Sequence, residues 1–373
     1  MVSNATRGKK VGRYSVMFHK RVFVGLFLLV LLLGSLNVAK AKGWLIPAQP
    51  SVVVGEGKRI SLQDLTLEQK IAQMVVVAGG THNMVAWKNM QIGGIHLFAK
   101  KDGAVYKKVI SDFQEGMKIP FFVTVDLEGC LNPFAEFHIS RALGEIKNVG
   151  EAFQKGSDEG RLLKELGFSV NFAPVVDLHD EIWKCRTFQG DEKQISELAE
   201  AYILGLQSQG IIATAKHYPG KALEISDPHK FLVAATVSEK DVYPYVYLGD
   251  KKEVKAVMVT HVIASGAVDS EGKPAVASSM AIGELKKDFS GLIVTDDTMM
   301  LGLRKFYGSK EKLYVDVFKA GNDIILNFDE DPAEIYHMIQ VVASAVGEGE
   351  ISSAQIDTSV RKILTAKGFV VEG

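Results

Sequence analysis

Eight short apolar segments, separated by polar stretches of helical period, constrain the fold of this chain more than any other feature of its sequence. Each segment is a continuous run of aliphatic and β-branched residues rather than an alternation of apolar and polar ones. Continuous runs are typical of strands that are buried on both faces, as in parallel sheets. The segments are MVVVAG from Met74, GGIHLFA from Gly93, PFFVTVD from Pro120, SVNFAPVVD from Ser169, IIATAKH from Ile211, AVMVTHV from Ala256, GLIVTDD from Gly291 and NDIILNF from Asn322.

The stretches between these segments have the pattern of helices. KQISELAEAYILGLQSQG and KEKLYVDVFKAG are amphipathic and end at glycine, as helices often do. Before the first segment, TLEQ at Thr66–Gln69 has the form of a capping box and predicts the start of a helix. Strands alternating with helices predict an α/β fold, a (β/α)8 TIM-like barrel that forms a single catalytic domain over residues 60–373. An open, doubly wound sheet is the alternative.

The first 41 residues have the pattern of a targeting segment. Basic residues between Lys9 and Arg21 precede an apolar run, Val22–Leu36, and an A-x-A cleavage pattern ends at Ala41. We therefore expect residues 1–41 to be a signal peptide or, because the run approaches the length of a membrane span, an uncleaved membrane anchor. Both readings predict an exported protein that is extracellular, periplasmic or held on the outer side of a membrane. We expect residues 42–59, before the first predicted helix, to be a linker.

Composition and charge narrow the range of partners. The 373 residues are 47% hydrophobic and carry a formal net charge of −1, which suits a globular protein with a sizeable core. Because no basic block interleaved with aromatic residues occurs, we expect no nucleic acid as a partner and favour a neutral or weakly charged small substrate. Cys130 and Cys185 are the only cysteines, and the sequence leaves open whether they pair.

Polar residues stand where five successive predicted strands end. In a barrel, catalytic residues come from the carboxyl ends of the strands, so these side chains would meet at one face of the fold. Any chain turns polar where a strand ends, and one such residue alone would mean little. The residues are Asp126, Asp177, Lys216 with His217, His261, and Asp296 with Asp297.

Two chemistries fit a ring of aspartate, histidine and lysine side chains. In retaining glycoside hydrolysis, a carboxylate attacks the anomeric carbon while a second group protonates the leaving oxygen. In a metal-dependent barrel hydrolase, histidines and an aspartate hold a catalytic metal. The metal alternative requires clustered ligands such as H-x-H at an early strand end, where the first segment is followed only by His82. We therefore expect no metal and no cofactor.

The stretch KHYPGKALEISDPHK, Lys216–Lys230, resembles the K-H-[FI]-P-G-x-G-x-x-x-x-D-x-H signature of the β-N-acetylhexosaminidase branch of glycoside hydrolase family 3. The interval from Gly220 to Asp227 and His229 is the same. Further landmarks of the family occur in its order along residues 60–370: LTLEQKIAQM, IGGIHLFAK, VDLEG, NFAPVVDL, RTF, VMVTHV, AVASS, LIVTDD and AGNDIIL.

The resemblance implies a catalytic role for three residues. Asp296, the first aspartate of TDD, matches the nucleophile of the family. His229 matches its general acid/base, and Asp227 matches the partner that orients this histidine. Histidine suits the proton transfer because its ordinary pKa lies near neutrality. The residues alone allow Asp296 or Asp297 to cap the following helix instead, and His261 fits a core histidine better than a catalytic one.

Four further residues match the groups that hold the hydroxyls of the terminal sugar: Asp126, Arg186, Lys216 and His217. The implied protein is a retaining exo-β-N-acetylglucosaminidase. Its expected substrates are small carbohydrates that contain N-acetylglucosamine, in peptidoglycan fragments or chitooligosaccharides. Water is the expected acceptor, and phosphate is the alternative.

Departures from the family pattern affect both parts of the predicted site. Cys130 replaces a glycine after D-x-E and no arginine follows before Arg141, so one sugar contact is expected to be lost or moved. In the loop that carries Asp227 and His229, GKALEIS replaces a glycine-rich stretch, and Pro228 stiffens the chain between the two residues. These changes leave a second class of function open, an exported sugar-binding protein derived from such an enzyme.

Overall fold

The computed structural model describes residues 22–34, 46–223 and 230–373. Within these residues, eight parallel strands lie side by side in the order β10, β8, β6, β5, β4, β3, β2, β11. The first and last of them meet through a bridge between Val294 and Ile324, which nearly closes the sheet into a barrel. The strands are β2 Val75–Ala78, β3 Gly94–His96, β4 Phe122–Val125, β5 Val170–Asn171, β6 Ile212–Tyr218, β8 Ala256–Val259, β10 Leu292–Thr295 and β11 Ile325–Leu326.

The predicted (β/α)8 barrel is therefore confirmed, and each strand lies within its predicted segment except β6, which runs one residue further, to Tyr218. Every residue of the eight strands is buried. Because their inner faces meet in the barrel and their outer faces meet the helices, both faces must be apolar. This burial explains why the segments lack the alternation of a half-exposed sheet.

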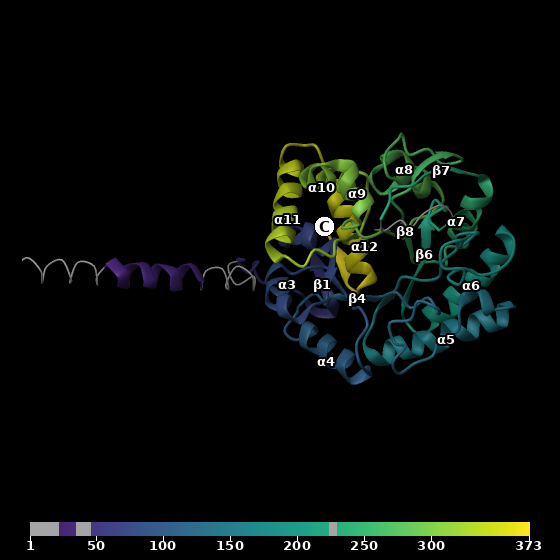
Figure 1. The fold of residues 1–373 in the computed structure, drawn as a ribbon, viewed down its shortest axis with the longest axis horizontal. Coiled ribbons are helices and arrows are strands. Elements are labelled where there is room, and N and C mark those ends of the chain that lie inside the picture. The colour runs from purple at the N-terminus through teal and green to yellow at the C-terminus, as the bar shows by residue number, and fades with distance from the viewer. Residues whose placement is uncertain (1–21, 35–45, 224–229) are drawn as a thin grey trace, which may run out of the picture.

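Helices surround the strands (Figure 1). Two of them confirm helix predictions from the sequence, because KQISELAEAYILGLQSQG covers all of α6 except its first residue, Glu192, and KEKLYVDVFKAG contains α10. The capping box at Thr66 and Gln69 is also present at the start of α2. The helices are α2 Leu67–Gln73, α3 Met84–Met90, α4 Gly103–Gln114, α5 Val149–Leu166, α6 Glu192–Ser208, α7 Glu239–Lys251, α8 Ser279–Asp288, α9 Leu301–Tyr307, α10 Lys310–Lys319, α11 Pro332–Gly347 and α12 Ser353–Ala366.

Helices α5 and α6 approach each other closely through glycines at their contact. A Cβ atom on Gly156 would lie 2.1 Å from the carbonyl oxygen of Tyr202, a distance that only glycine avoids. The close approach allows Tyr202 Oη to donate to Glu159 Oε2 at 2.6 Å, and Asn171 Nδ2 of β5 lies 3.2 Å from the same hydroxyl. Asn171 in turn binds the backbone of Leu127, just beyond β4. This buried network supports the segment that enters the site.

Residues 46–58 pack against the barrel, although the sequence predicts a linker over 42–59. Ile46 and Val52 are buried members of the core, and Gln49 N donates to Asn89 O at 2.8 Å. These two apolar side chains anchor the stretch to the barrel. Residues 42–45 lie outside the described part of the chain.

Two small parallel sheets accompany the barrel. Strand β1, Arg59–Ser61, pairs with β12, Val370–Glu372, so the two ends of the domain meet. Strand β7, Ala234–Val237, pairs with β9, Ile263–Gly266, beside the loop that follows β6.

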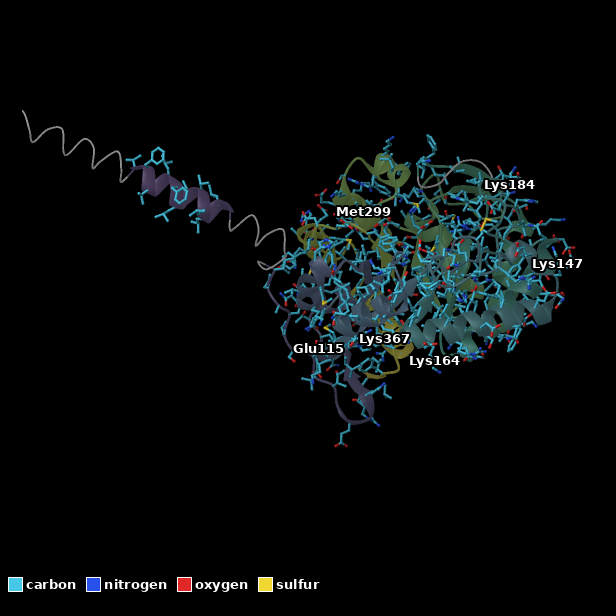
Figure 2. All side chains as sticks on the ribbon, turned by 60° about the horizontal axis from the view of Figure 1, so that its bottom comes forward. Glu115, Lys147, Lys164, Lys184, Met299 and Lys367 are labelled. Carbon is cyan, nitrogen blue, oxygen red and sulfur yellow. A yellow bond between two sulfur atoms is a disulfide. The ribbon has the colours of Figure 1, made fainter. Side chains whose placement is uncertain are left out.

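Residues 22–34, within the predicted targeting segment, form a helix with exposed side chains (Figure 2). Among the residues that the structure describes, no helix is both long enough and apolar enough to cross a membrane. Residues 1–21 and 35–41 lie outside the described part. A signal peptide or anchor over residues 1–41 therefore stays a prediction.

Candidate active site

A cavity of about 320 Å³ lies at the carboxyl ends of the barrel strands. Its charged and polar wall comes from the segments that end or follow β4, β5, β6 and β10. This is where a barrel places its chemistry. The polar lining residues are Asp126, Glu128, Arg186, Lys216, His217, Asp296 and Asp297, and the apolar ones are Phe98, Leu131, Met258, Met300, Leu326 and Phe328.

The structure brings together all the predicted site residues that it describes. Asp126, Arg186, Lys216, His217 and Asp296 line this one cavity. The predicted acid/base pair, Asp227 and His229, lies outside the described residues, in the gap 224–229 after β6.

Lys216 is the charged centre of the cavity wall. Its Nζ lies 2.6 Å from Asp126 Oδ1 and 2.5 Å from Glu128 Oε1. Burial lowers the pKa of Lys216, but the charges of Asp126 and Glu128 raise it, and the net direction is upward. Lys216 is therefore a charged donor in the cavity wall at neutral pH.

Glu128 is a site residue that the strand-end analysis missed. Arg186 donates two hydrogen bonds to the Glu128 carboxylate, from Nε to Oε2 at 2.6 Å and from Nη2 to Oε1 at 2.9 Å. The guanidinium also lies 4.7 Å from the centre of the Trp183 ring, within reach of a cation–π interaction. The sequence signal for Glu128 was the D-x-E spacing, which can place Asp126 and Glu128 on the same side of an extended segment.

The segment that carries Arg186 is held by Asp180. The Asp180 carboxylate accepts from the backbone N–H groups of Trp183, Cys185 and Arg186 at 2.8–2.9 Å. Burial raises the pKa of Asp180, but these backbone donors outweigh it and lower the pKa below its ordinary value. The charged form of Asp180 thus shapes the turn that directs the guanidinium into the cavity.

Cys130 and Cys185 form a disulfide, which answers the question that the sequence left open. It lies beside the labelled Lys184 in Figure 2. The bond joins the segment after β4 to the segment after β5, and these segments carry Glu128 and Arg186. A covalent link thus accompanies their ion pair.

His217 is oriented by Asp177, another of the strand-end residues. Its Nδ1 lies 2.7 Å from Asp177 Oδ2, and its Nε2 lies 3.4 Å from Arg186 Nη2. A guanidinium has only donors, so this contact is favourable when Nε2 carries a lone pair and the proton sits on Nδ1. In that form His217 presents an acceptor towards the cavity.

His96, at the end of β3, is a second residue for which the sequence indicated no role. Its Nδ1 is 2.9 Å from Thr124 Oγ1 and its Nε2 is 3.5 Å from Asp126 Oδ2. Burial lowers the pKa of His96 from 6.5 to about 4, and the charge of Asp126 opposes this only in part. A neutral imidazole therefore supports Asp126 from below. The contact depends on the register of β3 and β4, which pairs His96 with Thr124.

The two aspartates after β10 have different surroundings. Asp297 Oδ1 accepts from the backbone N–H groups of Met299, at 3.0 Å, and Phe328, at 3.2 Å, so it joins the turn after β10 to the segment after β11. Asp296 Oδ1 accepts from Asp297 N at 2.8 Å. His261 Nε2 contacts the Asp297 carbonyl oxygen at 2.8 Å, as expected of a core histidine.

The place of Arg141 bears on the arginine that the sequence lacks after D-x-E. Arg141 forms an exposed ion pair with Glu151 at 3.1 Å and is not part of the cavity wall. It therefore does not replace that arginine.

Within the described residues, no three histidine, cysteine, aspartate or glutamate side chains are grouped as metal ligands.

Comparison with known sequences gives a family. The family model described as "Glycosyl hydrolase family 3 N terminal domain" matches residues 66–366. The β-hexosaminidase LpqI of Mycobacterium tuberculosis is 28% identical over 331 residues, which cover 82% of this chain and 83% of that protein. A β-N-acetylglucosaminidase/β-glucosidase of Cellulomonas fimi is 25% identical over 341 residues, and this chain spans 58% of its length.

Solved structures agree with the sequences. A family 3 glycosyl hydrolase of Mycobacterium smegmatis has a TM-score of 0.72 and 26% identity, over 82% of this chain and 98% of that one. A family 3 β-N-acetylglucosaminidase of Paenibacillus sp. has a TM-score of 0.73 and 26% identity, over 82% of this chain and 62% of that one. The match therefore covers the barrel and its cavity. The chain is a glycoside hydrolase and belongs to glycosyl hydrolase family 3.

Proposed function

We propose that this protein is a retaining exo-β-N-acetylglucosaminidase that hydrolyses terminal N-acetylglucosamine from peptidoglycan fragments or chitooligosaccharides. The observation that carries the proposal is the cavity in which Asp296 lies with Asp126, Arg186, Lys216 and His217. The names of two relatives support the sugar, since LpqI is a β-hexosaminidase and the Paenibacillus protein a β-N-acetylglucosaminidase.

The charges of the cavity wall suit a neutral sugar. Lys216 and Arg186 are balanced by Asp126 and Glu128, and Asp296 and Asp297 make the wall as a whole acidic, which does not disfavour an uncharged substrate. Sugar hydroxyls can both donate and accept, and the wall provides partners for both. In this proposal Lys216 and Arg186 donate, whereas Asp126 accepts. The acceptor nitrogen of His217 completes the set.

The proposed reaction has two steps, each with its own bond change. The Asp296 carboxylate attacks the anomeric carbon while the bond to the leaving oxygen breaks and that oxygen takes a proton from His229. Water then attacks the anomeric carbon, gives a proton to His229 and releases the Asp296 carboxylate. Asp227 stabilises the histidine cation that donates the proton in the first step and forms again in the second. Two inversions at one carbon give retention of configuration.

Two features support an exported protein. Basic residues followed by the apolar run of residues 22–36 form a targeting pattern. The disulfide between Cys130 and Cys185 is of the kind that persists in oxidising compartments. We therefore place the enzyme outside the cytoplasm in this proposal.

The test is release of nitrophenol by the full chain from 4-nitrophenyl N-acetyl-β-glucosaminide, beside 4-nitrophenyl β-glucoside. Turnover of the acetamido sugar alone is the expected result, with nuclear magnetic resonance showing the β-anomer as the first product. A rate that requires added phosphate would change the acceptor, and a rate abolished by a chelator and restored by metal would revive the metal-dependent alternative. A folded protein that binds N-acetylglucosamine without turning over either substrate would be a sugar-binding protein, and the proposal would fail.

A further inference from the structure

Glu128 is a buried carboxylate that takes no direct part in the proposed reaction. It follows strand β4 and is 1% exposed. Hydrogen bonds fix the backbone around it, because Leu127 N donates to Asn171 Oδ1 at 2.9 Å and Glu128 N donates to Leu131 O at 3.0 Å. The fold therefore sets the position of this carboxylate before any substrate arrives.

Three charged contacts converge on the Glu128 carboxylate. Arg186 donates through Nε and Nη2, and Lys216 Nζ lies 2.5 Å from Oε1. Both carboxylate oxygens are thus engaged by cations. Because the planar guanidinium meets the carboxylate with two parallel bonds, the direction of Arg186 is fixed as well as its distance.

Asp126 faces the same lysine but has a different place in the cavity. The side chain of Asp126 is 40% exposed, whereas that of Glu128 is 1% exposed. A sugar entering the cavity can therefore reach Asp126, while Glu128 stands behind the two cations. Of the two carboxylates of D-x-E, Asp126 can contact the substrate, whereas Glu128 supports the cations.

The charges around Lys216 show why the support must be an anion. Burial raises the pKa of Glu128, but Arg186 and Lys216 outweigh it and lower this pKa below its ordinary value. Without Glu128, Lys216 would keep Asp126 as its ion-pair partner, and Arg186 would lose its two-bond partner and keep only the more distant charges of Asp126 and Asp177. The other titratable groups around this centre are His96 behind Asp126, His217 next in sequence with its partner Asp177, and Asp296 and Asp297 across the cavity.

We propose that Glu128 is the positioning residue of the sugar site, which holds Arg186 and Lys216 where they meet the substrate hydroxyls and stabilises the charged form of Lys216. The inference rests on the proposed function, since it assigns these two cations to the sugar. Glu128 acts through them and takes no part in bond making.

The test begins with the Glu128→Gln variant, which keeps the shape and removes the charge. We expect KM for 4-nitrophenyl N-acetyl-β-glucosaminide to rise at least about tenfold at pH 7, with a smaller change in kcat. Loss of the Glu128 charge also lowers the pKa of Lys216, so kcat/KM should fall at a lower alkaline pH than in the wild type. A folded variant with unchanged KM and an unchanged alkaline limb would overturn the proposal.

Two further variants separate positioning from general stability. Glu128→Asp keeps the charge on a shorter side chain and should restore the alkaline limb while KM stays raised; it also carries the test if Glu128→Gln does not fold. The matched control is Asp323→Asn, which removes the charge from another buried carboxylate, paired with Lys362 away from the cavity. It should lower thermal stability and leave the pH profile unchanged. The same shift of the alkaline limb in this control would remove the special role of Glu128.

Calorimetric binding of N-acetylglucosamine distinguishes failure of this inference from failure of the proposed function. If the wild-type protein binds the sugar but does not turn over substrate, the proposed function fails, and Glu128→Gln should still bind at least about tenfold more weakly. If the wild type turns over substrate and Glu128→Gln binds the sugar as tightly, only the inference about Glu128 fails.

Discussion

The disulfide between Cys130 and Cys185 stands two residues after Glu128 and directly before Arg186, so a covalent bond and a buried ion pair join the same two segments of the barrel. The ion pair fixes the guanidinium towards the cavity. The disulfide limits how far the two segments can separate. Cys130, which departs from the family pattern, thereby becomes part of the support of the sugar site.

Replacing both cysteines by serine should weaken the fold and the site together. The bond spans 55 residues of sequence, and loss of such a link typically lowers the free energy of unfolding by about 2–4 kcal/mol. We expect KM to rise because Arg186 is held less firmly, with kcat changed less. Urea unfolding and steady-state kinetics measure both effects. The wild type in the presence of a dithiol reductant serves as the control and should behave like the variant; an unchanged urea midpoint and KM would contradict this role.

Asp296 and Asp297 should respond differently to replacement by alanine. Asp296→Ala removes the proposed nucleophile, so turnover should fall at least about a thousandfold while the protein stays folded. Asp297→Ala removes an acceptor of two backbone N–H groups and should cost about 1–3 kcal/mol of stability, with measurable turnover retained. Nitrophenol release and thermal unfolding of the two variants form the comparison. An active Asp296→Ala enzyme would refute the nucleophile assignment.

The barrel could be predicted because its strands are buried on both faces. Segments such as GLIVTDD are apolar throughout and turn polar where the strand ends, so the same letters indicate the strand and the position of Asp296. Asp126 and Lys216 follow from the same rule. Their contact at 2.6 Å requires only that their segments end at the same face of the barrel.

The supporting residues could not be predicted in this way, because their roles depend on neighbours far away in sequence. Glu128 faces Arg186 across 58 residues, and D-x-E alone does not show which carboxylate meets cations and which meets solvent. His96 lies within an apolar run and has the pattern of a core residue until the register places it beside Thr124. The sequence likewise did not show that Ile46 and Val52 join the core of the barrel.

His96 should make the fold sensitive to acid. Its pKa of about 4 in the folded protein lies below the ordinary value of 6.5, so the folded state binds fewer protons than the unfolded state between these values. Its contribution is therefore complete above about pH 6.5 and is lost as the pH falls towards about 4, in total about 3 kcal/mol. Between pH 7 and pH 4.5, His96→Gln should lose about 2–3 kcal/mol less stability than the wild type in urea unfolding.

The control for this titration is His82→Gln, which changes an exposed histidine in the turn after β2. It should follow the wild type through the same pH range. Equal acid sensitivity of the wild type and His96→Gln would show that other groups account for the loss.

His229 should be needed most by substrates with poor leaving groups. A 2,4-dinitrophenolate leaves without a proton, whereas a sugar alkoxide must be protonated as the bond breaks. His229→Ala should therefore lower kcat/KM at least about a hundredfold for N-acetyl-chitobiose and much less for the 2,4-dinitrophenyl glycoside. Asp227→Ala should show the same order of substrates with a smaller loss, because Asp227 acts through the histidine. If both substrates lose activity to the same degree, His229 serves binding or folding, and the proton must come from another group.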